Sequence, residues 1–332
     1  EVNGVAYATL SEAIAAANAG DTVKLIANFT TDATKTEAAD RLIVKKSITL
    51  DLNGYTMTIP AELEQTNNWA AFYINGGTMT VKDSSADGSG KMQSGDANTL
   101  GTYLFHLNSG NLVIESGNYF AGCTVANVQK GTATVNGGSF AVYVDEGEDS
   151  RYLLNCIDAN YKNGTAHIVV NGGTFVGYDP RNNAAEGEGT NFVAPGVGVN
   201  ADANGNFVAK ANMLVQLVDA DGNSVAAYDN LDDAFYHAQD EKNPTLIVLQ
   251  DIVDSNPVSI TATNTTDSIT LDLNGHNISF VENKWSAIWS GFNIQNAAAL
   301  DLIITGKGTI TAAASNVAAI CVQGSNLSTR TT

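Results

Sequence analysis

Cysteine, proline and positive charge are scarce in this chain of 332 residues. Its three cysteines, Cys123, Cys156 and Cys321, are too few and too scattered for a disulfide framework, so we expect small buried hydrophobic side chains. Acidic residues outnumber basic ones by 35 to 16, and the net charge of -19 repels phosphate backbones and anionic lipid headgroups. We therefore expect no nucleic-acid partner and no membrane-surface partner.

Long apolar runs are missing as well. None approaches the roughly 18 residues that a membrane span needs, so no membrane insertion is expected. The chain opens at Glu1 without an initiator Met or an apolar signal segment, which predicts a mature or excised fragment. Gly is abundant, with 31 residues against 5 Pro, and hydrophobic residues make up 44%. This composition predicts a folded chain of short strands and tight turns.

One long unit of the sequence is duplicated. The segment SITLDLNG at residues 47–54 recurs at residues 268–275, which is 221 positions later. At the same offset Tyr7, Leu10 and Ala13 match Tyr228, Leu231 and Ala234. Residues 179–212 lack sustained periodicity and mark a boundary. We therefore predict a first module over residues 1–212 with a closing tail, and a second, incomplete module over residues 213–332.

A smaller unit recurs inside the first copy. Alternating apolar residues lead into V-N-G-G-[ST]-F at residues 135–140 and 170–175, with a looser form at 114–119 and an I-N-G-G segment at 74–77. From Val81 to Ile114, Val135 and Val170 the steps are 33, 21 and 35 residues. A period-2 strand buries only one face, and stacking such strands in layers builds one continuous core. The pattern predicts an all-β fold, a right-handed parallel β-helix (solenoid), with a β-sandwich as the alternative.

The polar and glycine residues of these units are expected at the corners of the coil. We assign corner positions to Asn75, Asn136, Asn171, Gly137 and Gly172. The amides of Asn136 and Asn171 should stack and bond along the axis, because equivalent corners repeat at the sheet spacing of about 4.8 Å. Gly137 and Gly172 are expected to supply the positive φ angles of a sharp corner.

Each copy opens with the signal of a short helix. In the first copy Thr9 and Glu12 form a capping box and precede an apolar stripe that ends before Gly20. In the second copy Asn230 is the expected N-cap, with Asp233 three residues later and an apolar stripe on residues 231–238. Such a helix covers the open end of a solenoid, so both are predicted to be end caps, and a partner-binding helix is the alternative.

These segments resemble a known architecture. The opening at residues 7–14, the strand TLDLNG at 49–54 and the NGGTF units are similar to the pectin-lyase-like β-helix modules of secreted or surface-anchored bacterial proteins. Residues 175–180 and 187–192 resemble the tail that closes such modules. The resemblance implies an extracellular location, secreted or on the cell surface. It implies no particular activity, because polysaccharide lyases, hydrolases, phage appendages and non-catalytic adhesive repeats share this fold.

The signals of catalysis are weak. The best candidate for the base of a uronate lyase is Arg151, which follows an acidic run at residues 145–149, but such a run is usually a solvated face. A glycosidase would need two carboxylates about 5 to 10 Å apart, which distant layers of a solenoid could supply. The four histidines, His106, His167, His237 and His276, stand isolated in the sequence. The enzyme question stays open, with a non-catalytic chain favoured.

Two other patterns suggest ligands. Asp83 and Asp87 place oxygens at alternating positions of DSSADG, so Ca²⁺ is the one cofactor considered, although Ser94 stands where an EF-hand has its bidentate Glu. A plain polar turn is the alternative. Trp69 and Trp289 match at an offset of 220 residues and could stack on sugar rings or simply pack a loop onto the layer below.

These observations favour a non-catalytic extracellular surface module that serves as a stalk, coat or adhesin-like repeat and contacts glycans or surface proteins. A β-helix polysaccharide lyase or glycoside hydrolase and a phage or secreted appendage are the alternatives. Because the second copy is short, its last layer is expected to leave Ile320, Val322 and Leu327 uncovered, so that further modules or another subunit would cover that end.

Overall fold

The chain folds mainly into β-strands, as the sequence predicts. The computed structural model describes residues 1–30, 42–59, 69–94, 102–143, 152–254, 256, 258–261, 266–281, 290–295, 300–312 and 318–323. Two units result: unit 1 comprises residues 1–194 and 202–209, and unit 2 comprises residues 195–201 and 210–332. The helices of the described part are α1 (Leu10–Ala16), α2 (Asp158–Lys162) and α3 (Leu231–Ala238).

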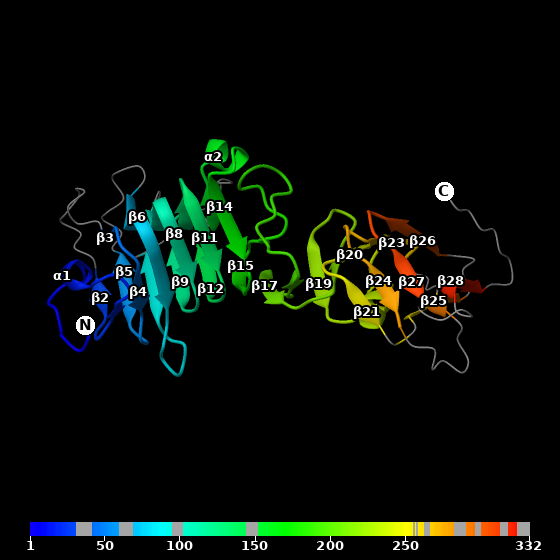
Figure 1. Cartoon of the computed structure of the whole chain (residues 1–332), viewed down its shortest axis with the longest axis horizontal. Helices are drawn as coiled ribbons and strands as arrows, with labels where there is room; N and C mark the ends of the chain where they lie inside the picture. The colour runs from blue at the N-terminus through cyan, green and yellow to red at the C-terminus, as the bar shows by residue number, and fades with distance from the viewer. Residues whose placement is uncertain are drawn as a thin grey trace. The chain divides into compact units, whose positions relative to one another are not determined.

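Three arrays of parallel strands make up most of unit 1, in which successive strands lie side by side (Figure 1). Array A contains β1 (Thr22–Lys24), β4 (Ile48–Asp51), the second halves of β6 (Trp69–Lys82) and β8 (Thr102–Ile114), β11 (Gly131–Val135) and β14 (Ala166–Val170). Array B contains β2 (Phe29–Thr30), β5 (Thr56–Ile59), β7 (Lys91–Ser94), β9 (Asn118–Ala121), β12 (Ser139–Val142) and β15 (Gly173–Val176). Array C contains β3 (Leu42–Val44), the first halves of β6 and β8, β10 (Thr124–Val128) and β13 (Leu154–Cys156).

The chain visits the arrays in the order A, B, C and then returns to A, and we call one such pass a layer. Alternate residues of each strand point into the space between the arrays, which is why the period-2 pattern forms the core. In array B the inward column ends with Tyr119, Phe140 and Phe175, all buried. Their rings stack at centroid distances of 5.2 and 5.1 Å. The aromatic residue of each N-G-G-[ST]-F unit is therefore a core residue.

Unit 2 repeats the same three-array plan. Array A contains β20 (Thr245–Val248), β23 (Ser268–Asp272) and β26 (Asp301–Thr305), array B contains β21 (Ile252–Asp254), β24 (Ile278–Phe280) and β27 (Ile310–Ala312), and array C contains β22 (Val258–Thr261), β25 (Ser290–Gln295) and β28 (Ala318–Gln323). All of these pairs are parallel. The strands β18 (Val215–Val218) and β19 (Ser224–Tyr228) form an antiparallel hairpin, and β18 also pairs with β20 in the antiparallel sense. The remaining strands are β16 (Val197–Ala201) and β17 (Asn206–Ala211).

Both predicted opening helices are present with the expected caps. The Thr9 hydroxyl accepts the Glu12 N–H at 3.1 Å, and the Glu12 carboxylate accepts the Thr9 N–H at 3.3 Å. At α3 the Asn230 side chain accepts the Asp233 N–H at 2.8 Å. Each helix buries its apolar stripe, with α1 against β3 and α3 against β18, β19, β20 and β22.

Candidate functional site

The predicted corner asparagines of unit 1 bond from layer to layer. Asn171 Nδ2 donates to Asn136 Oδ1 at 2.9 Å, as expected, and Asn136 Nδ2 donates to Glu115 Oε1 at 3.1 Å. Two layers earlier Asn108 Nδ2 donates to Asn75 Oδ1 at 2.7 Å. These amides run along the stacking direction, so they join successive layers rather than converge on a ligand.

The prediction of positive φ at Gly137 and Gly172 is wrong. The positive φ angles belong to the second glycine of each pair, with 111° at Gly138 and 117° at Gly173. Glycine is needed at the first position for another reason. A Cβ on Gly137 would lie 2.7 Å from the Glu115 carbonyl oxygen, and one on Gly172 would lie 2.5 Å from that of Asn136. The backbone of the preceding layer leaves no room for a side chain there.

The carboxylate of Asp83 is surrounded by protein donors. Oδ1 accepts the N–H groups of Gly54 at 2.8 Å and Ser85 at 3.1 Å. Oδ2 accepts the Ser85 hydroxyl at 2.8 Å and the Gly90 N–H at 2.7 Å. Desolvation raises the pKa of Asp83, but these hydrogen bonds outweigh it and hold the pKa below its ordinary value. Asp83 thus fastens its own loop to the Gly54 turn of the previous layer.

Asp87 lies at the exposed tip of the same loop. Its Oδ1 accepts the Ser89 hydroxyl at 2.8 Å and the Ser89 N–H at 3.2 Å, and these bonds lower the pKa of Asp87. Among the residues that the structure describes, no three His, Cys, Asp or Glu side chains converge on a position that could hold a metal. Ca²⁺ binding by Asp83 and Asp87 stays a prediction.

The tryptophan prediction falls largely outside the described residues. Trp289 and the side chain of Trp69 are not described, although the backbone of Trp69 begins β6. Arg151, the lyase candidate, is likewise outside the described residues. Glycan stacking by the two tryptophans stays a prediction.

The histidines are less isolated than the sequence suggests. His106, Asn127 and Asn155 occupy matching positions of β8, β10 and β13. Asn127 Nδ2 lies 3.3 Å from His106 Nδ1, and Asn155 Nδ2 donates to Asn127 Oδ1 at 3.3 Å. His106 Nε2 lies 3.4 Å from Gln129 Oε1. Sequence reasoning missed this buried polar column because its members come from different layers. Aligning F-H-L, A-N-V and L-N-C at one strand position would have revealed it.

The other histidines sit at the surface or near it. His276 Nδ1 lies 3.5 Å from Asp251 Oδ1, and His237 stacks on Tyr228 at a centroid distance of 5.5 Å. His167 Nε2 lies 2.8 Å from the Gly164 carbonyl oxygen. His237 Nδ1 also lies 3.9 Å from Asp240 Oδ2, so His237 and His276 each have one exposed aspartate beside them.

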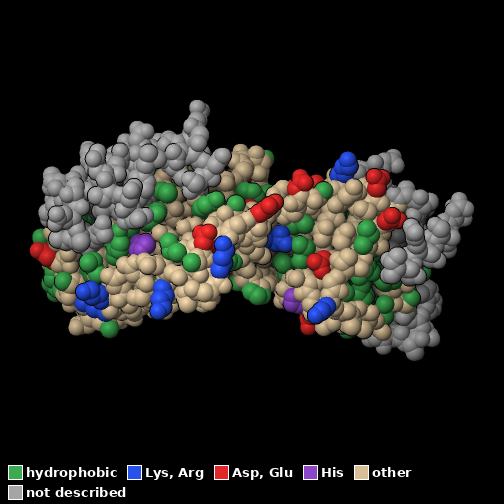
Figure 2. Space-filling view, turned by 90° about the horizontal axis from the view of Figure 1, so that it is seen from above, with side chains coloured by type: hydrophobic (Ala, Val, Ile, Leu, Met, Phe, Trp, Pro, Cys, Tyr) green, Lys and Arg blue, Asp and Glu red, His purple; other side chains and the backbone are tan. Residues whose placement is uncertain are grey.

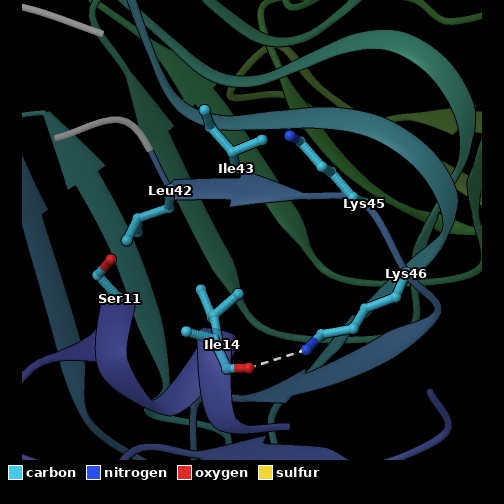
Figure 3. Close-up of a pocket in the computed structure, with 7 residues that line it drawn as sticks. Ser11, Ile14, Leu42, Ile43, Lys45 and Lys46 are labelled. Atoms are coloured by element: carbon cyan, nitrogen blue, oxygen red, sulfur yellow. Dashed lines mark hydrogen bonds between the residues drawn. The ribbon is translucent and has the colours of Figure 1, made fainter. Parts of the chain in front are cut away.

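A hollow lies between α1 and β3 (Figure 3). Its described lining consists of Ser11, Ile14, Ala15, Leu42, Ile43, Lys45 and Lys46. Lys46 Nζ donates to the carbonyl oxygens of Ala15, at 3.1 Å, and Ala17, where it caps the C-terminal end of α1. The described lining holds no carboxylate, imidazole or aromatic ring, so it offers an apolar surface with one further amine, that of Lys45.

Residues 178–194 and β17 cover the edges of the last layer of unit 1. Glu186 is buried, and its Oε1 accepts the Cys156 N–H at the edge of β13 at 2.5 Å. Val170 N–H donates to the Phe192 carbonyl oxygen at 2.8 Å, which occupies the edge of β14. The edge of β15 pairs with β17 in the antiparallel sense. All three arrays of unit 1 therefore end on a covered edge.

Glu186 itself was missed by sequence reasoning. Burial raises its pKa, while the bond from the Cys156 N–H lowers it and the negative charge of Asp158 raises it further. Its Oε2 has no hydrogen-bond partner in the part of the chain that the structure describes. In the sequence Glu186 is one of several acidic residues in a polar segment. Only the fold shows that it contacts the edge of β13.

Comparison with protein-family models, with curated proteins and with solved structures finds no match to this chain. Within the described residues, no helix is both long and apolar enough to cross a membrane. Figure 2 shows one face of the molecule, on which acidic and basic side chains are scattered over a mostly uncharged surface. Several polar groups that the structure brings together join one layer to the next, such as Asn136 with Asn171 and Asp83 with Gly54.

Proposed function

We propose that both units are right-handed parallel β-helices and that the chain is a non-catalytic extracellular surface module, a structural stalk, coat or adhesive repeat. One observation carries the proposal: the polar side chains that recur in the sequence bond from layer to layer. Asn171, Asn136 and Glu115 form one such ladder, and Asp83 fastens its loop to the turn of the layer before. Such bonds add to the nearest-neighbour stacking that stabilises a solenoid.

The chemistry of the site supports a structural role over a catalytic one. Asp83 accepts four hydrogen bonds from the protein. A general acid or base would instead need an oxygen directed at a substrate. The secreted or cell-surface location rests on the resemblance and on the acidic, Gly-rich composition. Glycans or surface proteins are the proposed partners, with Trp69 and Trp289 as the candidate contacts for sugars.

Removing one whole layer tests the layered plan. Deletion of residues 115–135 joins Ile114 to Asn136, and because Ile114 pairs with Val135, the remaining strands can stack in register. The shortened chain should fold and melt cooperatively at a lower temperature, with the β circular dichroism retained. The matched control deletes residues 115–124, which is about half a layer and should abolish folding of unit 1. Equal behaviour of the two deletions would reject the layered plan.

Incubation with a panel of acidic and neutral polysaccharides tests the absence of catalysis. We expect no release of reducing ends and no ultraviolet absorbance from unsaturated uronates. Turnover that persists through purification and is lost on heat unfolding would favour the lyase or hydrolase alternative instead.

A further inference from the structure

The two opening helices share a buried apolar stripe but differ on their outer faces. Where α1 has Ala15 and Ala16, α3 has Tyr236 and His237 at the offset of 221 residues. Residues 228–241 hold five acidic residues and no Lys or Arg, whereas the matching residues 7–20 hold one acidic residue. Because α1 caps unit 1 without these rings and charges, capping does not explain their presence on α3.

Three rings of unit 2 meet at the outer face of α3. The His237 ring stacks on Tyr228 at a centroid distance of 5.5 Å and an interplanar angle of 13°, and Tyr236 meets His237 at 5.1 Å and 86°. Tyr236 is 66% exposed, and the His237 side chain is 51% exposed. We call Tyr228, Tyr236 and His237 the ring cluster. Its exposed ring surface is available to a ligand.

Carboxylates lie around the ring cluster. Asp240 Oδ2 is 3.9 Å from His237 Nδ1. Burial raises the pKa of Tyr228, and the negative charges of Asp233, Glu241 and Asp240 raise it further, so three carboxylates act on one ring. The outer face of α3 therefore combines aromatic surface with negative charge, and both of these attract cations.

Resting on the proposed function, in which surface proteins are partners, we propose that the outer face of α3 binds an arginine-bearing segment of another protein. A guanidinium group stacks on an aromatic ring and also donates two parallel hydrogen bonds to one carboxylate, which an ammonium group cannot do. Asp232 precedes the exposed rings in the chain, and Asp240 and Glu241 follow them. The negative charges are thus spread along the helix and fit several cations on one chain better than a single small cation.

Titration of the whole chain with a capped hexa-arginine peptide, monitored by calorimetry, tests the proposal. We expect a Kd of about 10 to 200 µM at about 50 mM salt, and binding of hexa-lysine that is weaker by about threefold or more. Tyr236→Ala and His237→Ala introduce the residues that α1 has at these positions and leave every carboxylate in place. Each should weaken binding of hexa-arginine by about threefold or more. The peptide should slow hydrogen exchange at residues 228–241.

The net charge of -19 by itself attracts a basic peptide, so a second pair of variants matches the change in charge. Asp232→Asn lies on the outer face of α3, and Asp221→Asn lies at the end of the β18–β19 hairpin opposite Tyr228. Both aspartates are exposed, and each variant removes one negative charge. Only Asp232→Asn should weaken binding, by about threefold. Circular dichroism checks the folding of every variant, and if one fails to fold, the remaining variants decide.

Four results would overturn the proposal. They are no binding at about 1 mM hexa-arginine, unchanged binding in both Tyr236→Ala and His237→Ala, equal weakening by Asp232→Asn and Asp221→Asn, and displacement of the peptide by an equal concentration of choline chloride, which would indicate a site for one small cation. The proposed function is tested separately by the deletion of residues 115–135 and by the polysaccharide panel. A folded deletion variant and an absence of turnover, together with a chain that binds no peptide, would reject the arginine-bearing partner alone.

Discussion

Units 1 and 2 make their D-L-N-G turn in the same way. Asn53 and Asn274 both have positive φ angles, 48° and 50°, which asparagine tolerates better than most residues. Asn53 Nδ2 donates to the Leu25 carbonyl oxygen at 3.0 Å, and Asn274 Nδ2 donates to that of Val248 at 3.1 Å. In each unit the accepting carbonyl belongs to the preceding layer. The turn is thus defined by the layer on which it stacks, which is why it survives duplication unchanged.

The two units differ at their ends. Phe235 of α3 is fully buried and meets the ring of Phe292 at a centroid distance of 5.4 Å. The matching residue of α1 is Ile14, which borders the hollow beside β3. At the other end, unit 1 covers its strand edges with residues 178–194 and β17, whereas Ile304 and Ile320 in the last described layer of unit 2 are 38% and 37% exposed. The comparison shows that contacts with the neighbouring layer determine the turn geometry inside each unit, whereas the two units use different structures at their ends.

The largest expected effect is at the opening helices. Phe235→Ala removes a ring from a closely packed site and should lower the free energy of opening of unit 2 by about 3–5 kcal/mol. Ile14→Ala should cost unit 1 only about 2 kcal/mol, because the side chain already borders a hollow. Native-state hydrogen exchange reports each unit separately. A larger loss for Ile14→Ala would show that α1 is the better-packed cap.

Substitution of a corner glycine in unit 1 should have the next largest effect on stability. Gly172→Val directs a Cβ at the Asn136 carbonyl oxygen 2.5 Å away, so the layers must separate, at an expected cost of about 2–4 kcal/mol in unit 1. Thr132→Val at a half-buried, outward position of β11 is the control and should change stability by less than about 0.5 kcal/mol. An unchanged melting temperature in Gly172→Val would remove the close-approach argument.

Local signals predicted the local parts of this structure. The Thr9–Glu12 box, the Asn230 cap and the Asn136–Asn171 bond each depend on a few residues or on an exact repeat. The positive φ was assigned to the wrong glycine because a Gly-Gly pair does not show which of its two members adopts the positive φ. The His106 column depends on strand register, so it is visible in the sequence only once the strands are aligned, and Glu186 depends on a contact 30 residues away that no local pattern shows.

The D-L-N-G turn allows a direct test of how much a layer constrains its neighbour. Gly54 and Gly275 both have positive φ, so alanine at either should cost roughly 1 kcal/mol from the backbone alone. A Cβ on Gly54 would also meet Ser85 Cβ and Ser89 Oγ at 3.2 Å, whereas one on Gly275 would meet nothing within 4 Å. We expect losses of about 2 kcal/mol for Gly54→Ala and about 1 kcal/mol for Gly275→Ala, again from hydrogen exchange. Equal losses would mean that the DSSADG loop yields freely.

The smallest expected effect concerns the pH dependence of the closed end. Because burial raises the pKa of Glu186, its contribution to stability is fully present below the unfolded pKa of about 4.3 and is lost as the pH rises through the folded value. Glu186→Gln keeps an acceptor for the Cys156 N–H and removes the charge. Urea unfolding from about pH 4 to about pH 8 should therefore show the Glu186→Gln variant gaining stability relative to the original chain as the pH rises.

Asp83→Asn is the control, for which the opposite pH dependence is expected. Its lowered pKa stabilises the fold above the unfolded value of Asp, so the variant should lose most at neutral pH and recover on acidification. A Glu186→Gln curve parallel to that of the original chain would show that the carboxylate is hydrated and that the edge of β13 is not sealed.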